Sequence, residues 1–479
     1  MNAIPKSNLI NGKWIDNGPS FTSINPSDTS DCLGTFYAAT KEDCNLAIKS
    51  ANIAFIEWSQ SELEERKEIL DCIGQELIER SNELGELIAR EEGKPLAEGI
   101  GEVYRSGQFF QYFGAEVLRQ MGEITPSVRP NVNVEVTREP LGVIGVITPW
   151  NFPIAVAAWK IAPALAFGNS VVLKPSEIVP ASAYAFADIV HRSGLPKGAF
   201  NCIQGPGNIA GEILAKSKDI DAISFTGSVK TGTSVAQHAI KNMTRIQLEM
   251  GSKNALVVLN DADIDTAIQC AINGAFFGTG QKCTASSRLI VEQGIHDEFV
   301  TKMITATKAL VVGNALDKTT QIGPVVDARQ FNQNKDYIES AITEGATMVA
   351  GDETINTDNG FYMRPTLFTD TSNHMKINCE EVFGPIACVI KVSDYEEALS
   401  VSNDSKFGLS SGIVTQSLKH ANHFKRYSAS GCVMVNLPTA GTDYHVPFGG
   451  RKSSSYGPRE QGQYAKEFFT VVKTSYISS

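Results

Sequence analysis

The sequence predicts an α/β protein with more than one domain. In the middle of the chain, short apolar runs rich in β-branched residues alternate with helical stretches, and a second alternating pattern follows Glu249. Strands that are apolar on both faces and alternate with helices favour a parallel sheet covered by helices on each side. At 479 residues the chain is also too long for one ordinary core, so we expect two or three domains.

The first part of the chain is predicted to be a short hairpin followed by helices. Residues 9–25 contain Asn-Gly pairs, which favour tight turns between strands. From about 40 to 120, apolar residues recur at intervals of three and four, the spacing of one helix face. This pattern predicts helices over 41–58, in two pieces of 61–94, and over about 96–119.

The clearest strand and helix alternation lies between about 140 and 240. The predicted strands cover 142–147, 171–174, 199–203 and 222–225, and the helices between them lie near 154–167, 179–193, 208–217 and 228–240. Ligands of such sheets bind beyond the carboxyl ends of the strands. The candidate ligand loops are therefore 148–153, 174–177, 204–211 and 226–232.

The second alternating pattern has a strand at 255–259, a helix at 262–275 and a strand at 288–292. Two further strands, at 131–138 and 468–477, have no obvious neighbour in the sequence. An unpaired strand edge readily pairs with another chain. We therefore expect both segments to form a sheet between subunits.

Composition excludes several classes of function. A net charge of −11 and the absence of a basic arm argue against nucleic acid, and no apolar run reaches the roughly 18 residues that cross a bilayer. The N-terminus lacks the apolar core of a signal peptide, and nine scattered cysteines without CxxC spacing indicate reduced thiols. These features predict a cytoplasmic protein. His420 and His423 have no HExxH context, so we expect a solvated helix face and no metal site.

One cysteine stands in a context that suggests chemistry. Cys283 lies in the small and polar stretch 278–288, downstream of Glu249 at the end of an apolar run. A thiol must lose its proton to attack a carbonyl, and a carboxylate can take that proton if the fold joins the two. A lone cysteine is more often a small buried hydrophobe, so the assignment depends on the other motifs.

Other loops suggest a dinucleotide. The loop 226–232 follows an apolar strand and opens a helix, whose free N–H groups favour an anion. Lys174 and Glu177 could bind the hydroxyls of a ribose, although the alternative is a surface ion pair. The glycines of 205–211 do not match GxGxxG and are weak evidence.

Seven motifs follow one another along the chain: TPWNFP at 148–153, KPSE at 174–177, FTGS at 225–228, LEMGSKN at 248–254, GQKC at 280–283, EEVFGP at 380–385 and PFGGRKSS at 447–454. In this order they resemble, nearly from end to end, the motifs of the NAD(P)-dependent aldehyde dehydrogenase superfamily. The resemblance implies an aldehyde dehydrogenase-like fold with a Rossmann-type cofactor domain, an α/β catalytic domain and a small β oligomerisation arm. It assigns 1–122 and 141–250 to dinucleotide binding, 251–440 to the thiol domain, 123–140 and 463–479 to the arm, and 441–462 to an interdomain segment. A homodimer or homotetramer is implied.

The resemblance also implies a mechanism. Cys283 would attack the aldehyde, and the Asn151 amide with the Cys283 backbone N–H would hold the oxyanion. Glu249 would activate the water that hydrolyses the resulting thioester, and Lys160 would orient these groups.

A larger set of residues is implied to bind the coenzyme, which would be NAD or NADP. Glu177 would repel a 2′-phosphate and so favours NAD, whereas Ser176 and Lys174 leave NADP open. The full set is Thr148, Trp150, Lys174, Ser176, Glu177, Gly207, Phe225, Gly227, Ser228, Glu381 and Phe383.

The segments 439–450 and 453–462 are similar to those of 2,5-dioxovalerate (α-ketoglutarate semialdehyde) dehydrogenases, which implies that aldehyde as the substrate. Arg105 would bind its carboxylate, with Gln108 one turn along the helix and Phe152 and Trp159 as apolar walls. The alternative is that Arg105 pairs with an acid such as Glu102. Ser252 departs from the usual pair of glycines after the base and could change how that loop approaches the nicotinamide.

Several other functions stay open at this point. Succinate semialdehyde or a broad range of aldehydes are alternative substrates. Acylating relatives that pass the thioester to coenzyme A generally lack a carboxylate at the position of Glu249, so its presence favours hydrolysis. A thiol hydrolase would lack a histidine base, and a non-catalytic structural protein would have no need of Asn151, Glu249 and Cys283 together.

Overall fold

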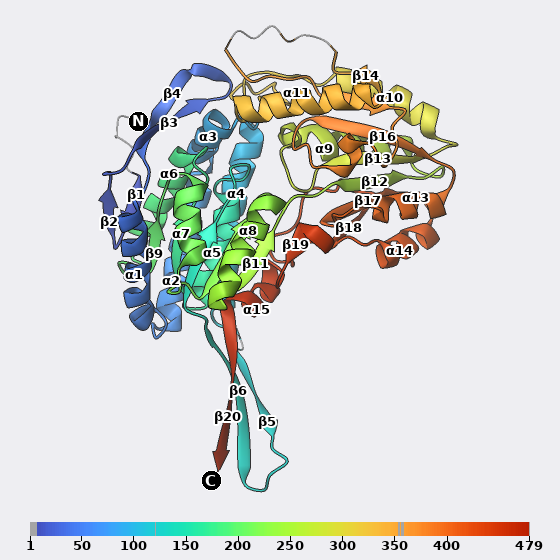
Figure 1. Ribbon diagram of the computed structural model, residues 1–479. Coiled ribbons are helices and arrows are strands. Elements are labelled where there is room, and N and C mark those ends of the chain that lie inside the picture. The colour runs from blue at the N-terminus through green and yellow to red at the C-terminus, as the bar shows by residue number, and fades with distance from the viewer. Residues whose placement is uncertain (1–6, 120, 353–354, 356–358, 479) are drawn as a thin grey trace.

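The computed structural model describes residues 7–119, 121–352, 355 and 359–478. Residues 1–6, 120, 353–354, 356–358 and 479 of the predicted domain ranges lie outside the described part of the chain. Two large sheets lie side by side, each between layers of helices, and a narrow three-stranded sheet extends away from them (Figure 1). The predicted α/β class is confirmed.

The first large sheet has eight strands, and its five central strands run parallel as the apolar runs predicted. One face packs on α2, α4, α5 and α6, and the other packs on α1, α7 and α8. In sheet order the strands are β19 (Ser455–Tyr456), β11 (Arg245–Glu249), β10 (Ala222–Thr226), β7 (Val143–Ile147), β8 (Ser170–Lys174), β9 (Phe200–Cys202), β1 (Asn8–Ile10) and β2 (Lys13–Ile15). Asn11 and Gly12, both with positive φ, form the tight turn between β1 and β2 that the Asn-Gly pair predicted.

The second large sheet has seven strands, six of them parallel. Helices α9 and α10 cover one face, and α13 and α14 cover the other. In sheet order the strands are β14 (Thr347–Ala350), β15 (Thr366–Thr369), β16 (Ile386–Val392), β13 (Ser286–Glu292), β12 (Asn254–Val258), β17 (Ser410–Val414) and β18 (Cys432–Val435).

The helices begin and end close to the predicted positions. The π-helical turn η1 (Gly207–Gly211) leads into α7, where one helix near 208–217 was expected. The α-helices are α1 (Lys41–Trp58), α2 (Leu63–Glu79), α3 (Ser81–Glu92), α4 (Leu96–Glu116), α5 (Ala155–Ala166), α6 (Pro180–Arg192), α7 (Glu212–Lys216), α8 (Val229–Ala239), α9 (Ile264–Phe276), α10 (His296–Lys308), α11 (Ala328–Thr343), α12 (Lys376–Cys379), α13 (Tyr395–Asn403), α14 (Leu418–Tyr427) and α15 (Lys466–Phe469). A separate hairpin of β3 (Ser20–Asn25) and β4 (Asp28–Tyr37) lies beside α3. No helix within the described ranges is long and apolar enough to cross a membrane.

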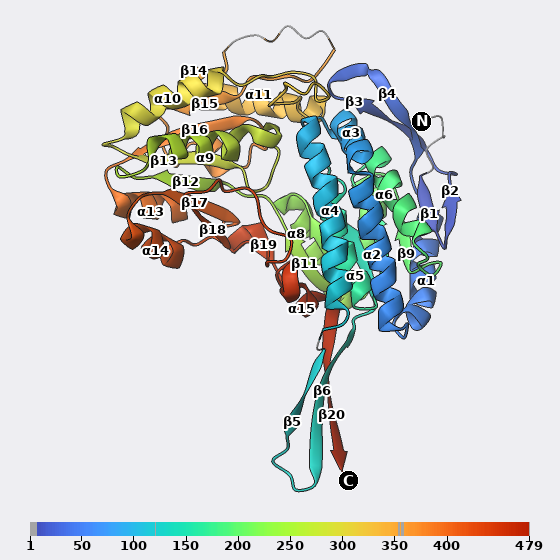
Figure 2. The same cartoon turned by 180° about the vertical axis from the view of Figure 1, so that it is seen from behind.

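The two strands without obvious neighbours pair with each other. The last strand, β20 (Thr470–Ser478), runs antiparallel to β6 (Val132–Pro140), and β5 (Gly122–Pro126) completes the arm that Figure 2 shows extending from the body. The expectation that these strands pair with another subunit is therefore wrong for the β6–β20 contact, which forms within one chain. The pairing begins where Arg245 Nη1 donates to the carbonyls of Phe468 and Thr470 at 3.0 and 2.8 Å, which directs the chain end toward β6.

Candidate active site

A cavity of about 1240 Å³ lies between the two large sheets. Its walls include the loops that follow β7, β10 and β11 at the carboxyl edge of the first sheet. Ligands of parallel sheets are expected to bind at this edge. The opposite wall includes the segment 282–284, which leads into β13, and the segment 380–383, which leads into β16. The cavity thus joins both halves of the fold.

The structure brings most of the predicted site residues to this cavity. Those that line it are Arg105, Trp150, Asn151, Phe152, Trp159, Gly227, Ser228, Glu249, Cys283, Glu381 and Phe383. Thr148, Lys160, Lys174, Ser176, Glu177, Gly207 and Phe225 lie outside the lining, on the elements that support it or continue from it.

Gln108 does not line the cavity, so its role in substrate binding stays a prediction. Glu98, Glu102, Arg105 and Phe109 of α4 line the cavity. At about 100° per residue, position 108 is turned well away from the face that these four residues share, whereas position 109 lies on it.

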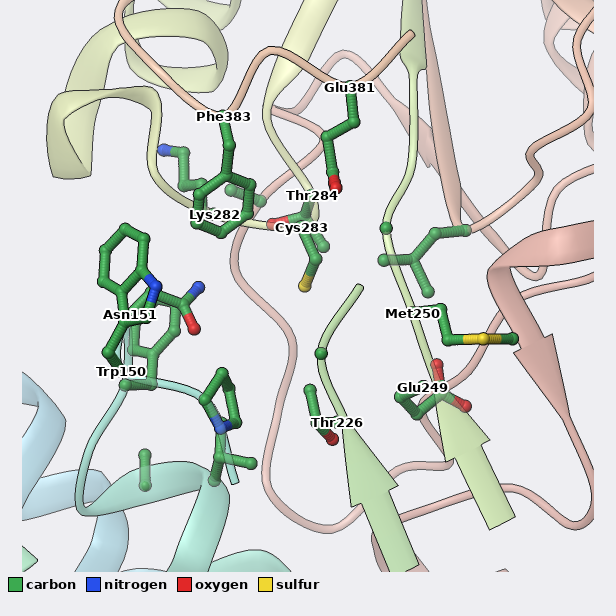
Figure 3. Close-up of a pocket in the computed structure, with 18 of the residues that line it drawn as sticks. Trp150, Asn151, Thr226, Glu249, Met250, Lys282, Cys283, Thr284, Glu381 and Phe383 are labelled. Carbon is green, nitrogen blue, oxygen red and sulfur yellow. The ribbon is translucent and has the colours of Figure 1, made fainter. Parts of the chain in front are cut away.

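Cys283 projects from a tightly wound stretch, here called the thiol loop (residues 278–285). Three successive residues, Gly278, Thr279 and Gly280, have φ of 64°, 54° and 64°. A Cβ on Gly280 would lie 2.1 Å from the Gly384 carbonyl oxygen, so the loop can approach the next segment only with glycine there. Figure 3 shows the Cys283 sulfur pointing into the space between Asn151 and Glu249.

The charges around Cys283 keep it as a thiol. Burial raises its pKa, and the carboxylates of Glu381 and Glu249 raise it further. The thiol is therefore protonated near neutral pH and needs a base or an added positive charge before it can act as a nucleophile.

Asn151 links the two halves of the cavity. Its Nδ2 donates to the Gln281 carbonyl in the thiol loop at 2.9 Å. An amide nitrogen carries two hydrogens, so one donor remains for a group bound next to the sulfur. This arrangement can stabilise an oxyanion.

Glu249 is the last residue of β11 and is 3% exposed. Its Oε2 accepts a hydrogen bond from Ser455 Oγ at 2.5 Å, on the neighbouring strand β19. Burial and the nearby Glu460 raise its pKa well above the usual value, against the effects of Ser455 and Lys160. A carboxylate with a raised pKa is suited to take a proton near neutral pH.

Lys160 does not reach the cavity but lies directly behind it. Its Nζ donates to Ser224 Oγ at 2.9 Å and to Glu460, which also accepts from Trp159 Nε1 at 2.7 Å. Sequence reasoning missed Glu460. A single lysine in the apolar helix AVAAWKIAPALA indicates that a buried acid lies nearby in the fold. The sequence does not show which acid far along the chain this is.

A second group of predicted residues clusters at the end of β8. Lys174 Nζ lies 3.1 Å from Glu177 Oε2, so the predicted ion pair exists, but Lys174 is buried rather than on the surface. A Cβ on Gly207 would lie 3.6 Å from the same Nζ. Thr148 N–H donates to the Lys174 carbonyl at 3.1 Å and joins this group to the β7 loop.

The loop after β10 opens α8. Ser228 caps the helix by accepting from Thr231 N–H at 3.2 Å, so the helix N-terminus is aimed at the cavity that Ser228 lines. Phe225 is buried and supports Gly227, where a Cβ would lie 2.6 Å from its ring. Thr226 Oγ1 is buried without a hydrogen-bond partner among the described residues. A ligand with polar oxygens would satisfy this hydroxyl.

The segment 380–383 closes the cavity on the side of the second sheet. Glu381 Oε1 accepts from Ser252 N–H at 2.8 Å, and burial raises its pKa to about 7. Phe383 has φ of 60° and meets the Trp150 ring edge-on at 5.3 Å. Gln330 of α11 holds this strained turn by donating to the carbonyls of residues 382 and 383.

The comparison with known proteins agrees with this geometry. A model of the aldehyde dehydrogenase family matches residues 14–475. The chain belongs to this family.

Relatives match the chain over nearly its whole length. The α-ketoglutarate semialdehyde dehydrogenase of Haloferax volcanii is 40% identical over 99% of both chains. The α-ketoglutaric semialdehyde dehydrogenase of Bacillus subtilis is 38% identical over 98% of this chain and 97% of its own. The crystal structure of betaine aldehyde dehydrogenase from Staphylococcus aureus in complex with NAD+ superposes with a TM-score of 0.96 at 34% identity, covering 99% of this chain and 95% of that one. The predicted fold and family are confirmed.

The Ser252 departure from the family pattern has a structural consequence. Ser252 Oγ donates to Asn254 Oδ1 at 2.7 Å, and Asn254 Nδ2 donates to the Cys283 carbonyl at 2.7 Å. The hydroxyl that a glycine would lack therefore helps to hold the backbone of the thiol loop.

Within the described residues, no group of three or more His, Cys, Asp or Glu side chains is placed to bind a metal.

We predict that Glu381→Gln lowers the pKa of the Cys283 thiol, because the substitution removes one of the charges that raise it. The pH curve for alkylation of Cys283 by iodoacetamide should move to lower pH, with about a tenfold higher rate at neutral pH for each unit of pKa. The rate is followed by mass spectrometry of the Cys283 peptide, because Cys32, Cys72 and Cys379 are exposed and would react with iodoacetamide as well.

Glu380→Gln is the matched control, because Glu380 lines the same cavity but accepts from Tyr337 Oη at 2.8 Å and does not act on the thiol. An alkylation curve for Glu381→Gln that stays in place or moves to higher pH contradicts the account.

Proposed function

We propose that this aldehyde dehydrogenase oxidises an aldehyde that ends in a carboxylate, with 2,5-dioxovalerate (α-ketoglutarate semialdehyde) as the substrate. One observation carries the proposal. Arg105 lines the cavity, and among the described residues it forms no ion pair with an acidic side chain. A cation in a binding cavity without a protein counter-ion favours an anionic ligand.

The surroundings of Arg105 support this assignment. The alternative partner, Glu102, is bound to Lys94 at 2.6 Å instead. The Arg105 guanidinium lies over the Tyr444 ring at 5.5 Å, which leaves its N–H edge available for a carboxylate. Phe152 and Trp159 line the same cavity and supply the apolar walls expected for the carbon chain.

The names of the relatives favour the same substrate class. Two of those described above are named for α-ketoglutarate semialdehyde, an aldehyde that carries one carboxylate at the other end of its carbon chain. The structural relative is named for betaine aldehyde, which carries a positive charge that Arg105 would repel. Succinate semialdehyde, with a shorter chain, is the alternative substrate that Arg105 would also bind.

The chemistry follows from the arrangement of three residues. Cys283 attacks the aldehyde carbon, and its proton passes to Glu249, whose raised pKa suits it to accept one. The free N–H of the Asn151 amide and the Cys283 backbone N–H hold the oxyanion. After oxidation leaves a thioester on Cys283 and Glu249 has released the first proton to solvent, Glu249 takes a proton from the water that hydrolyses the thioester. Lys160 and Glu460 set the charge behind Glu249.

The second group of residues fits a dinucleotide coenzyme. Lys174 and Glu177 would bind the adenosine ribose beside Gly207, and Ser176 would lie at the same edge. The N-terminus of α8 at Gly227 and Ser228 would face the pyrophosphate. The Thr226 hydroxyl, which has no hydrogen-bond partner among the described residues, would offer a polar contact there. Glu381, Phe383 and Trp150 would surround the nicotinamide end. When bound, the coenzyme supplies the hydride acceptor.

The parts of the chain then take distinct roles. Residues 1–122 and 141–250 would bind the dinucleotide, and 251–440 would present the thiol. The arm formed by 123–140 and 463–479 would join subunits of a homodimer or homotetramer. Its exposed apolar side chains include Ile124 and Tyr476, which a second subunit would cover.

We predict that Arg105→Ala raises KM for 2,5-dioxovalerate by about 10- to 100-fold, the loss expected for a charge-assisted contact. KM for propanal, which has no carboxylate, should change little. Aldehyde-dependent NADH formation measures both.

Arg119→Ala serves as the control, because Arg119 lies just beyond the same helix but pairs with Glu116 away from the cavity. If Arg105→Ala changes KM for 2,5-dioxovalerate and for propanal equally, the proposed substrate is contradicted.

A further prediction concerns the coenzyme. Glu177→Gln removes a negative charge from the site of the ribose, so kcat/KM with NADP should rise relative to NAD by about tenfold. Glu212→Gln, an exposed carboxylate paired with Lys216, is the control. An unchanged ratio of the two coenzymes in Glu177→Gln would show that this carboxylate does not select between them.

A further inference from the structure

The first two turns of α4 contact both loops that meet in the cavity. Glu98 accepts a hydrogen bond at 3.0 Å from the backbone N–H of Gly278, at the start of the thiol loop. Glu102, one turn further along, accepts at 3.0 and 3.1 Å from the backbone N–H groups of Ile154 and Ala155, where α5 begins. Residues four apart lie on one helix face, so both carboxylates point the same way.

Lys94, just before this helix, reaches the residue that bears the amide. Its Nζ donates to Glu102 Oε2 and to the Asn151 backbone carbonyl, both at 2.6 Å. The same ammonium lies 4.1 Å from the centre of the Phe152 ring. Lys94 therefore contacts two successive residues of the 148–153 loop, the backbone carbonyl of Asn151 and the side-chain ring of Phe152.

These charged groups are buried and neutralise one another. Lys94 is 3% exposed and Glu102 is 5% exposed, and Glu92 Oε2 lies 3.9 Å from the ammonium. Burial acts to lower the pKa of Lys94, but the two carboxylates outweigh it and the pKa is raised. A buried ammonium with fixed partners cannot shift without leaving a charge unpaired, so the pair is a rigid support.

Lys94 has no part in the chemistry proposed above. It does not line the cavity, and its three donors have protein acceptors or face the aromatic ring. Asn151, by contrast, is held at two points. Lys94 holds its backbone carbonyl, and the Gln281 carbonyl accepts from its side chain at 2.9 Å.

We propose that the Lys94–Glu102 ion pair is a positioning device that sets where the Asn151 amide lies relative to the Cys283 sulfur. The inference rests on the proposed role of Asn151 as oxyanion donor. Lys94 and Glu102 are positioning residues, because they act on the reaction through the backbone of Asn151 and the start of α5. An oxyanion donor that moves by a fraction of its hydrogen-bond length loses much of its effect on the transition state.

The test is the effect of Lys94→Met on kcat and KM. Methionine keeps the apolar stem but removes the ammonium, so kcat should fall about 10- to 100-fold. KM for the aldehyde and the coenzyme should change by less than about threefold, since neither binding contact is removed. Glu102→Gln, which keeps an acceptor for the N–H groups of Ile154 and Ala155, should give a smaller fall of the same kind and serves if Lys94→Met does not fold.

Glu91→Gln is the matched control. Glu91 is also buried, and it accepts from the backbone N–H groups of Ala181 and Ser182 at 2.7 Å, at the start of α6. It lies outside the cavity lining. Its substitution should lower the thermal midpoint without the selective fall in kcat, and an equal fall in kcat would overturn the proposal.

A double substitution separates this inference from the proposed function. In an Asn151→Ala background, Lys94→Met should cause no further loss of kcat, because the group that it positions is already gone. If kcat of the double variant falls by the product of the two single losses, the positioning role is overturned. A normal kcat in Lys94→Met alone would overturn it as well. A normal kcat in Asn151→Ala alone would instead overturn the proposed role of the amide.

Discussion

The hydrogen bond from Asn151 Nδ2 to the Gln281 carbonyl is the contact on which the site depends. It joins a loop that follows a strand of one sheet to a loop that precedes a strand of the other, so it sets the amide beside the thiol. Much of the nearby backbone is shaped to allow it. The left-handed run at 278–280 and the strained turn at Phe383 both serve close approach between segments, and the surrounding packing holds them in place.

The electrostatics of the cavity follow from a surplus of buried carboxylates. Glu249 and Glu381 face the thiol, and Glu460 lies behind them with Lys160 as its counter-ion. Burial and the carboxylates of Glu381 and Glu249 keep Cys283 protonated, whereas burial and the carboxylate of Glu460 raise the pKa of Glu249.

The sequence predicted what depends on local pattern and on ordered motifs. Local patterns predicted the parallel strands, the Asn-Gly turn and the residues at strand ends, because apolar runs and turn residues act locally. Partners far along the chain were not predicted. The acid that pairs with Lys160 is 300 residues away at Glu460, and the partner of β20 is β6, because tertiary packing alone brings such segments together. Gln108 lies outside the cavity lining because a small rotation around α4 decides which side chain faces the cavity.

The central claim is that Cys283 carries a thioester that Glu249 helps to hydrolyse. The most direct measurement is a single-turnover experiment on Glu249→Gln with aldehyde and NAD, followed by intact mass spectrometry. The account predicts a burst of about one NADH per subunit, then a near stop, with an acyl group on the Cys283 peptide. Steady turnover at the original rate without an acylated Cys283 would contradict it.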